Sequence, residues 1–187
     1  KSYMKVEAKS MTDEELVKEC LNNNQKAQKE LFVKYSSVMF GVCMRYTSSK
    51  NDAEDVLQEA FIKVFNKLEK YSNKGSFEGW IRRIVVNTAL DFIRKNKKMQ
   101  LNSSIDDVGY GLKNDQYVVE NLTARELMKI IQNIPIGYRT IFNMYAIEGY
   151  SHKEIAKELD ISESTSKSQL SRARSTIKEL LVDNKLI

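Results

Sequence analysis

The strongest constraint on the fold is a stretch in which two helical patterns are separated by only a short turn. It reads SHKEIAKELDISESTSKSQLSRAR and runs from Ser151 to Arg174. Ser151 and Glu154 predict a capping box, since a hydroxyl and a carboxylate at this spacing satisfy backbone amides that an opening helix leaves unpaired. Asp160, which tolerates a left-handed conformation, follows that helix. Ser162 can cap a second helix, so the chain must turn sharply between the two.

This second helix has two different faces. Leu170 and Ala173 begin an apolar stripe that recurs every three or four residues and predicts burial. The opposite face carries hydroxyl groups and cations, which suit base edges and phosphates. The pattern is typical of a helix-turn-helix that reads DNA with its second helix, and a helical hairpin with a solvated face is the alternative. His152, in the first turn of the first helix, is expected to lie at the surface or against a phosphate. The candidate DNA-contacting residues are His152, Ser162, Ser164, Thr165, Lys167, Ser168, Ser171, Arg172 and Arg174.

The rest of the chain predicts an all-α protein of two small domains. Its 187 residues are 42% hydrophobic and 29% charged, which is enough to form cores. The net charge of +5 favours an anionic partner. Residues 99–122 have a net charge of −3 and no sustained periodicity, whereas residues 1–98 carry +6 and residues 123–187 carry +2. We therefore interpret residues 99–122 as a flexible linker between two helical domains.

Helical periodicity, without the alternation of strands, covers both domains. In the first domain we expect helices over 12–22, 26–47, 51–68 and 77–97, with Thr12 and Asn51 as caps. In the second domain, Thr123 and Glu126 form a capping box at the start of a helix. The single proline of the chain, Pro135, ends that helix. The residues expected on the core side of the helix over 26–47 are Leu31, Tyr35, Val38, Val42 and Tyr46.

The helix expected over 51–68 presents a separate acidic side. Asp52, Asp55 and Glu59 lie on this side together with the apolar residue Ile62. In a chain of net positive charge, such a surface suits docking of a basic helical partner. An ordinary solvated acidic face is the alternative.

The helix expected over 77–97 and the loop before it predict a second nucleic-acid surface. Arg83, Asn87, Asp91 and Arg94 follow one another at spacings of four, four and three, and so form one polar stripe. In the loop over 71–76, aromatic and amide groups could hold unstacked bases while cations follow the phosphates. Tyr71 fits either this role or packing.

Several classes of function are not expected. Cys20 and Cys43 lie on helical patterns and predict buried free thiols, without a disulfide or metal framework. His152 is the only histidine, and no nucleophile–base pair, phosphate loop or ligand cluster accompanies it, so we expect no enzyme, cofactor or metal. No apolar run reaches membrane-spanning length and no signal peptide is visible, which predicts a cytoplasmic protein.

Three segments resemble the extracytoplasmic-function (ECF) subfamily of bacterial RNA polymerase sigma factors, in the same order and over nearly the whole chain. They are DAEDVLQEAFIKVF, FEGWIRRIVVNTALDFIRK and YRTIFNMYAIEGYSHKEIAKELDISESTSKSQLSRAR. The resemblance implies a region 2 domain over 1–98, a linker over 99–122 and a region 4 domain over 123–187. It implies core RNA polymerase, promoter DNA and an anti-sigma factor as partners.

By position, the resemblance also assigns roles to residues. The patch that binds core polymerase corresponds to Asp52, Asp55, Gln58, Glu59 and Ile62. The surface that reads and helps to melt the −10 element corresponds to Tyr71, Ser72, Asn73, Lys74, Arg83, Asn87, Asp91, Arg94 and Lys95. The helix-turn-helix residues named above correspond to the surface that reads the −35 element.

The chain departs from the family pattern in the helix-turn-helix. Asp160 stands where the turn usually carries glycine, and Ser164 and Ser166 stand where glycine and valine are common. Ser166 falls on the buried stripe, where a loss of packing is expected. A stand-alone helix-turn-helix repressor or activator, or an adaptor that binds other helices, is the alternative to a sigma factor.

Overall fold

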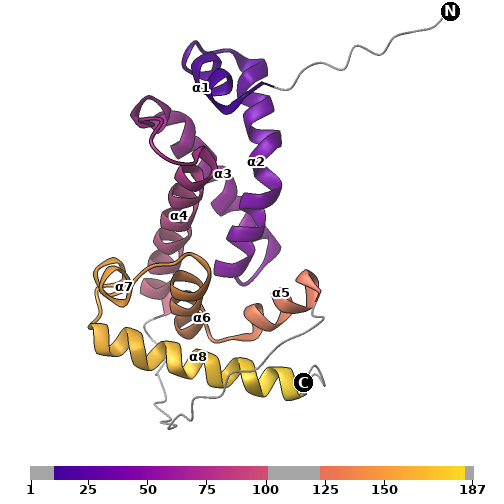
Figure 1. Ribbon diagram of the computed structural model, residues 1–187. Coiled ribbons are helices and arrows are strands. Elements are labelled where there is room, and N and C mark those ends of the chain that lie inside the picture. The colour runs from indigo at the N-terminus through magenta and orange to yellow at the C-terminus, as the bar shows by residue number, and fades with distance from the viewer. Residues whose placement is uncertain (1–10, 101–122, 184–187) are drawn as a thin grey trace, which may run out of the picture.

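The computed structural model describes residues 11–100 and 123–183, and for residues 97–100 only the backbone. Every regular element in these ranges is helical, which confirms the all-α prediction (Figure 1). The first unit contains α1 (Asp13–Leu21), α2 (Gln25–Tyr46), α3 (Lys50–Lys67), the 3-10 turn η1 (Leu68–Lys70) and α4 (Phe77–Gln100). The second unit contains α5 (Ala124–Asn133), α6 (Ile136–Phe142), the π-helical turn η2 (Asn143–Ile147), α7 (His152–Leu159) and α8 (Glu163–Asp183).

Local capping explains where most of the helices begin. The predicted capping boxes at Thr12, Thr123 and Ser151 are all formed, each with the glutamate three residues later. The expected cap at Asn51 was wrong. The helix begins at Lys50, because the Ser49 hydroxyl accepts the backbone amide of Asp52 at 3.1 Å.

In the first unit, α2, α3 and α4 pack on one another around an apolar core. Tyr35 and Val42 are buried as predicted, but Val38 is 48% exposed and the prediction for it was wrong. The core at this level of α2 is formed by Met39 and Cys43, both fully buried. A helix repeats every 3.6 residues, so Val38 lies at the edge of the stripe through Tyr35, Met39 and Val42, on the side away from Met39.

In the second unit, α8 packs across α6 and α7, and Ile155, Leu170 and Ala173 are buried between them. The turn after α7 is made by Asp160, with φ 53° and ψ 51°, the left-handed conformation expected from the sequence. The chain between α6 and α7 passes through η2 and turns at Gly149, whose φ is +77°.

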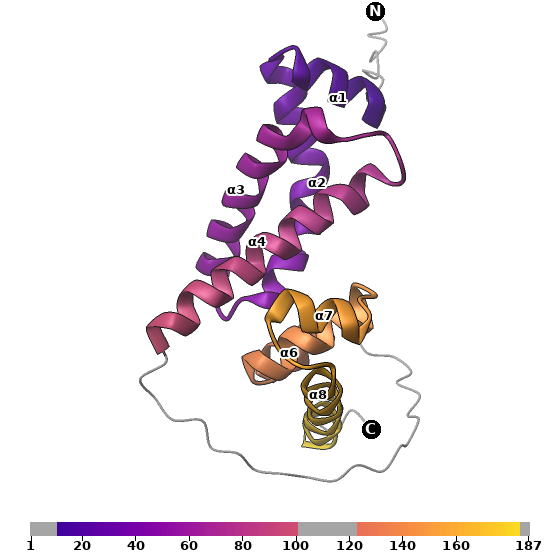
Figure 2. The same ribbon diagram turned by 90° about the vertical axis from the view of Figure 1, so that its left-hand side faces the viewer.

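The two units pack against each other, an arrangement that the sequence did not predict. Figure 2 shows α6 and α7 lying against α4 and the C-terminal end of α2. Ile141 and Met144 of the second unit are buried in one continuous core with α2, α3 and α4. Of the predicted linker over 99–122, the first residues continue α4 to Gln100, and residues 101–122 lie outside the described residues.

Candidate functional site

The outward side of α3 carries the acidic and apolar surface expected from its spacing. Asp55 and Gln58 are exposed, and Ile62 is 61% exposed, a high value for an isoleucine. Glu59 accepts a hydrogen bond from Lys63, with 2.9 Å between Oε1 and Nζ, and this bond lowers the pKa of Glu59. Glu59 therefore stays ionised, and the surface combines negative charge with an exposed apolar side chain.

Two further residues border this surface. Asp52 is half-buried and lines a cavity that also touches Ile136 of the second unit, so it differs from the other acidic residues in its surroundings. Phe32 of α2 packs edge-on against Phe61 with ring centroids 4.8 Å apart, and it is 37% exposed. Phe32 was not predicted to belong to a site, because its helical position indicates neither a core residue nor an acidic neighbour.

The polar stripe on α4 is present and is partly occupied by ion pairs. Asn87 and Lys95 are exposed, and Asp91 is half-buried between two cations. Its carboxylate lies 2.7 Å from Arg94 Nη1 and 3.6 Å from Lys63 Nζ. Asp91 thus connects the stripe to α3, and it orients Arg94 instead of standing free in solvent.

The loop before α4 is folded on itself around Tyr71. The Tyr71 ring lies 4.8 Å from the ring of Phe77 and 5.4 Å from that of Trp80, and its hydroxyl donates to the Gly75 carbonyl at 3.1 Å. Two left-handed residues, Asn73 and Gly75, allow this tight path. In this conformation Tyr71 serves packing. The polar residues of the loop that are exposed are Ser72, Asn73, Lys74 and Ser76.

In the helix-turn-helix, the hydroxyl groups at the start of α8 form a local network. Ser162 Oγ accepts the Thr165 amide at 3.0 Å, which caps α8 as predicted, and it lies 2.7 Å from Ser164 Oγ. Ser168 Oγ donates to the Thr165 carbonyl at 3.0 Å. Each hydroxyl oxygen retains acceptor capacity, and Ser162, Ser164 and Ser168 are exposed.

The cations of α8 fall into two groups. Lys167 and Arg174 are exposed. Arg172 is half-buried, and its Nη1 lies 3.4 Å from the hydroxyl of Tyr138 on α6. Thr165 and Ser171 are half-buried as well. The exposed candidates for DNA contact on α8 are therefore Ser164, Lys167, Ser168 and Arg174.

His152 has an additional role that the sequence did not reveal. Its Nδ1 lies 2.9 Å from the hydroxyl oxygen of Ser166, and its ring stacks on Tyr145 with 4.5 Å between centroids. Burial, and after it the charge of Lys167, lowers the pKa of His152. Ser166 is fully buried, as predicted, and its partner satisfies the hydroxyl that replaces a common valine. The two residues connect α7 to α8.

The structure describes residues 11–100 and 123–183, and both cysteines lie within these ranges. Cys20 and Cys43 are both free and buried, as predicted, and burial raises the pKa of the Cys43 thiol to about 12. No group of three or more metal-ligating side chains occurs in these ranges. None of the helices that the structure describes could span a membrane.

Comparison with known proteins identifies the class. The model of Sigma-70 region 2 matches residues 31–99, and the model of Sigma-70 region 4 matches residues 124–177. One match lies in each helical unit, and together they define an RNA polymerase sigma factor of the sigma-70 class.

Individual relatives then narrow the class. The chain is 31% identical to the ECF RNA polymerase sigma-E factor of Haemophilus influenzae, over 91% of this chain and 95% of that protein. It is 30% identical to the ECF sigma-E factor of Escherichia coli K12, over 96% of each. The chain belongs to the ECF family of RNA polymerase sigma factors.

A solved structure has the same fold. The sigma factor RpoE of Bartonella quintana, crystallised in complex with the anti-sigma factor NepR, matches with a TM-score of 0.51 and 21% identity, over 82% of this chain and 95% of that chain.

The protein is thus a transcription initiation factor that binds core RNA polymerase and promoter DNA. The alternatives of a stand-alone regulator and of a helix-binding adaptor are set aside.

Proposed function

We propose that the two helical units divide the work of promoter recognition between them. Residues 1–98 dock on core polymerase and contact the −10 element, residues 123–187 read the −35 element, and residues 99–122 connect the two. The observation that carries this proposal is that the acidic side of α3 and the hydroxyl-and-cation side of α8 are both exposed, on separate elements. One chain can therefore hold the polymerase and DNA at the same time.

The docking surface is assigned to Asp55, Gln58, Glu59 and Ile62, with Asp52 at its border. Ionised carboxylates around an exposed isoleucine match the usual composition of an interface, in which an apolar centre is surrounded by charges that steer the partner. A basic helical surface on the polymerase is the complementary partner.

The −10 surface is assigned to the stripe on α4 and the loop before it. Asn87 supplies an amide that can donate and accept, and the cations Arg83, Arg94 and Lys95 suit a phosphate backbone. The exposed loop residues Ser72, Asn73 and Lys74 lie next to this surface in sequence. This composition suits a melted strand, whose bases are unstacked and accessible to polar side chains.

The −35 surface is assigned to the first turns of α8. Ser164, Lys167 and Ser168 lie near the start of the helix, where a recognition helix meets base edges, and Arg174 lies where phosphates are the nearer target. We assign the chain no catalytic reaction of its own, place it in the cytoplasm with the polymerase, and expect an anti-sigma factor to control it.

The docking assignment can be tested by charge reversal. Asp55→Lys with Glu59→Lys is expected to weaken binding to core polymerase about tenfold, or roughly 1.4 kcal/mol, without changing helical content. Glu14→Lys with Glu69→Lys is the matched control, because both residues are exposed and the change in net charge is the same. Titration of labelled core polymerase measures the affinity of both double variants. Equal affinity of the two double variants would remove α3 from the interface.

A further inference from the structure

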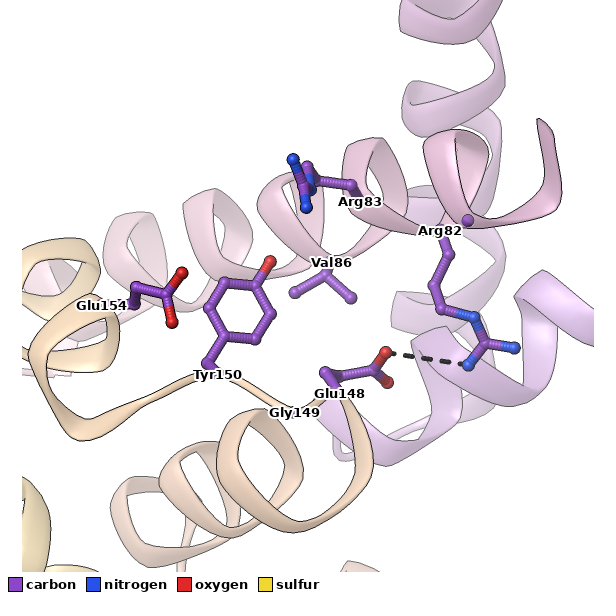
Figure 3. A pocket seen from close by; sticks show the side chains of 8 residues that line it. Arg82, Arg83, Val86, Glu148, Gly149, Tyr150 and Glu154 are labelled. Carbon is purple, nitrogen blue, oxygen red and sulfur yellow. Dashed lines mark ion pairs between the residues drawn. The ribbon is translucent and has the colours of Figure 1, made fainter. Parts of the chain in front are cut away.

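The interface between the two units is built around the buried carboxylate of Glu148. The side chain of Glu148 is only 4% exposed, and its Oε1 accepts a hydrogen bond from Arg45 Nη2 of α2 at 2.7 Å. Its other oxygen, Oε2, lies 3.7 Å from Arg82 Nη1 of α4. Figure 3 shows Glu148 reaching from the loop before α7 toward Arg82. Two helices of the first unit therefore share one carboxylate of the second.

The second unit also caps the C-terminal end of α2. The last carbonyl groups of a helix lack partners within the helix. Here the Arg45 carbonyl accepts from Asn143 Nδ2 at 2.8 Å, and the Met44 carbonyl accepts from Gln132 Nε2 at 3.2 Å. Arg139 adds a bond from Nη2 to Ser48 Oγ at 3.3 Å, just beyond the end of α2. These contacts specify one mutual orientation of the units.

The same interface contains features that oppose closure. Arg139 is 2% exposed and has no carboxylate partner among the residues that the structure describes, and its burial lowers its pKa. Its Nε, the Nε of Arg45, the hydroxyl of Tyr46 and Oδ1 of Asn143 are buried without a hydrogen-bond partner. Among the described residues, all buried side-chain atoms without a partner belong to residues of this interface. Unpaired buried polar atoms are costly, so the closed arrangement is specific without being strongly favourable.

The net charges of the two units also oppose closure. Residues 1–98 carry a net charge of +6 and residues 123–187 carry +2, so the two units repel each other at long range. Closure against this repulsion is stabilised by the apolar core that the units share and by opposite charges at short range. Glu148 with Arg45 supplies the shortest such contact between the units.

Closure covers part of the polar stripe on α4. Arg94 donates to the backbone carbonyl of Glu158 on α7, and its Nη2 lies 3.9 Å from the Glu158 carboxylate. Arg83 lines a cavity between the units together with Tyr150 and Glu154. Figure 3 shows the Tyr150 ring lying between the loop before α7 and α4. Two cations of the stripe thus face the second unit, whereas Lys167 and Arg174 on α8 remain exposed.

We propose that Glu148, Arg45 and Arg82 form an intramolecular latch that holds the free chain closed and reduces access of DNA to α4. The consequence for DNA rests on the proposed function of α4, whereas closure itself does not. When the latch opens, the stripe is released, and the units separate as far as residues 99–122 allow. Because α4 continues to Gln100, 22 residues separate the described units, and this length of chain could span roughly 70 Å at about 3.3 Å per residue.

The test uses the full chain and two readouts. Small-angle X-ray scattering measures opening, and titration of a mixed-sequence single-stranded DNA oligonucleotide measures access to α4. Glu148→Lys and Arg45→Glu break the latch from opposite sides, and Glu179→Lys, on the exposed side of α8, is the control for net charge. We expect both latch variants to show a larger radius of gyration with unchanged helical content, and about fivefold tighter DNA binding or more. The control should match the unmodified chain.

The outcomes separate this inference from the proposed function. An unchanged radius of gyration in both latch variants would overturn the latch, as would a loss of helical content in both, since the contacts would then be required for folding. Opening without a gain in DNA affinity would support the latch and count against the assignment of α4. If the gain in DNA affinity of the Glu148→Lys chain arises on α4, adding Asn87→Ala to that chain should remove most of the gain.

Discussion

Replacing Ser166 with alanine removes one hydrogen bond from the helix-turn-helix and very little volume. The bond joins His152 Nδ1 to Ser166 Oγ at 2.9 Å, between the first turn of α7 and the buried side of α8. Ser166 is fully buried, so its hydroxyl has no access to water, whereas His152 is half-buried. Alanine leaves the imidazole nitrogen without this partner, on a side chain that is partly exposed to solvent.

The expected cost follows from this geometry. A neutral intramolecular hydrogen bond contributes about 0.5–1.5 kcal/mol net, and larger penalties apply when a buried group is left unpaired. Because the group left behind is the accessible one, Ser166→Ala should destabilise the protein by about 1 kcal/mol. For a chain of 150 to 250 residues this corresponds to a fall in Tm of about 2–4 °C.

A double-mutant cycle isolates the bond from other effects. His152→Phe keeps a ring that can stack on Tyr145 while removing the hydrogen bond, so it serves as the second arm. Urea unfolding followed by circular dichroism should give a coupling energy of about 0.5–1.5 kcal/mol between the two changes. Additive single effects would show that the His152–Ser166 contact contributes nothing, and the reasoning would fail.

The same contact predicts a dependence on pH. Burial, and after it the charge of Lys167, lowers the pKa of His152 in the folded state below its ordinary value near 6.5. The unfolded chain therefore binds a proton more readily, so the free energy of unfolding should be constant above about pH 7 and fall as the pH drops below about 6.5. His152 is the only histidine, and His152→Phe should remove this dependence between about pH 5 and 7.

Three further outcomes are expected. Asn87→Ala should reduce open-complex formation on duplex promoters while core binding survives, and a premelted template should restore part of the activity. In holoenzyme titrations, Lys167→Ala should change preference among −35 sequences by about 1–3 kcal/mol, whereas Arg174→Ala should weaken all of them similarly and lower the salt slope by about one. Asp160→Ala should cost about 1 kcal/mol in urea unfolding because of the left-handed backbone, and Asp160→Gly should not.

The start and end of most helices could be predicted from neighbouring residues alone. The capping boxes at Thr123 and Ser151, the break at Pro135 and the left-handed turn at Asp160 each depend on atoms only a few residues apart. Such contacts form within any helix that begins or ends there, whatever the rest of the chain does. The exposed sides of α3 and α8 could be predicted from the same local periodicity.

The placement of single residues around a helix was less certain where two sides of it are both apolar. Val38 and Met39 are adjacent apolar residues, and either could continue a stripe from Tyr35. Only the packing of α3 and α4 on α2 decided that Met39 is buried and Val38 exposed. Likewise, the sequence placed His152 at the start of a helix, but the approach of α8 decided that its ring meets Ser166.

The contact between the two units was decided by tertiary structure alone. Arg45 and Glu148 are 103 positions apart in the chain, and each sits in a sequence that reads as an ordinary solvated helix end. Nothing in their neighbours distinguishes a buried ion pair from two surface charges, because burial depends on which surfaces meet. The sequence by itself determined the helices, most of their caps and the exposed polar surfaces that we propose contact polymerase and DNA. Long-range packing determined that the two units close on one another, through carbonyl groups of α2 and a carboxylate that has no partner within its own unit.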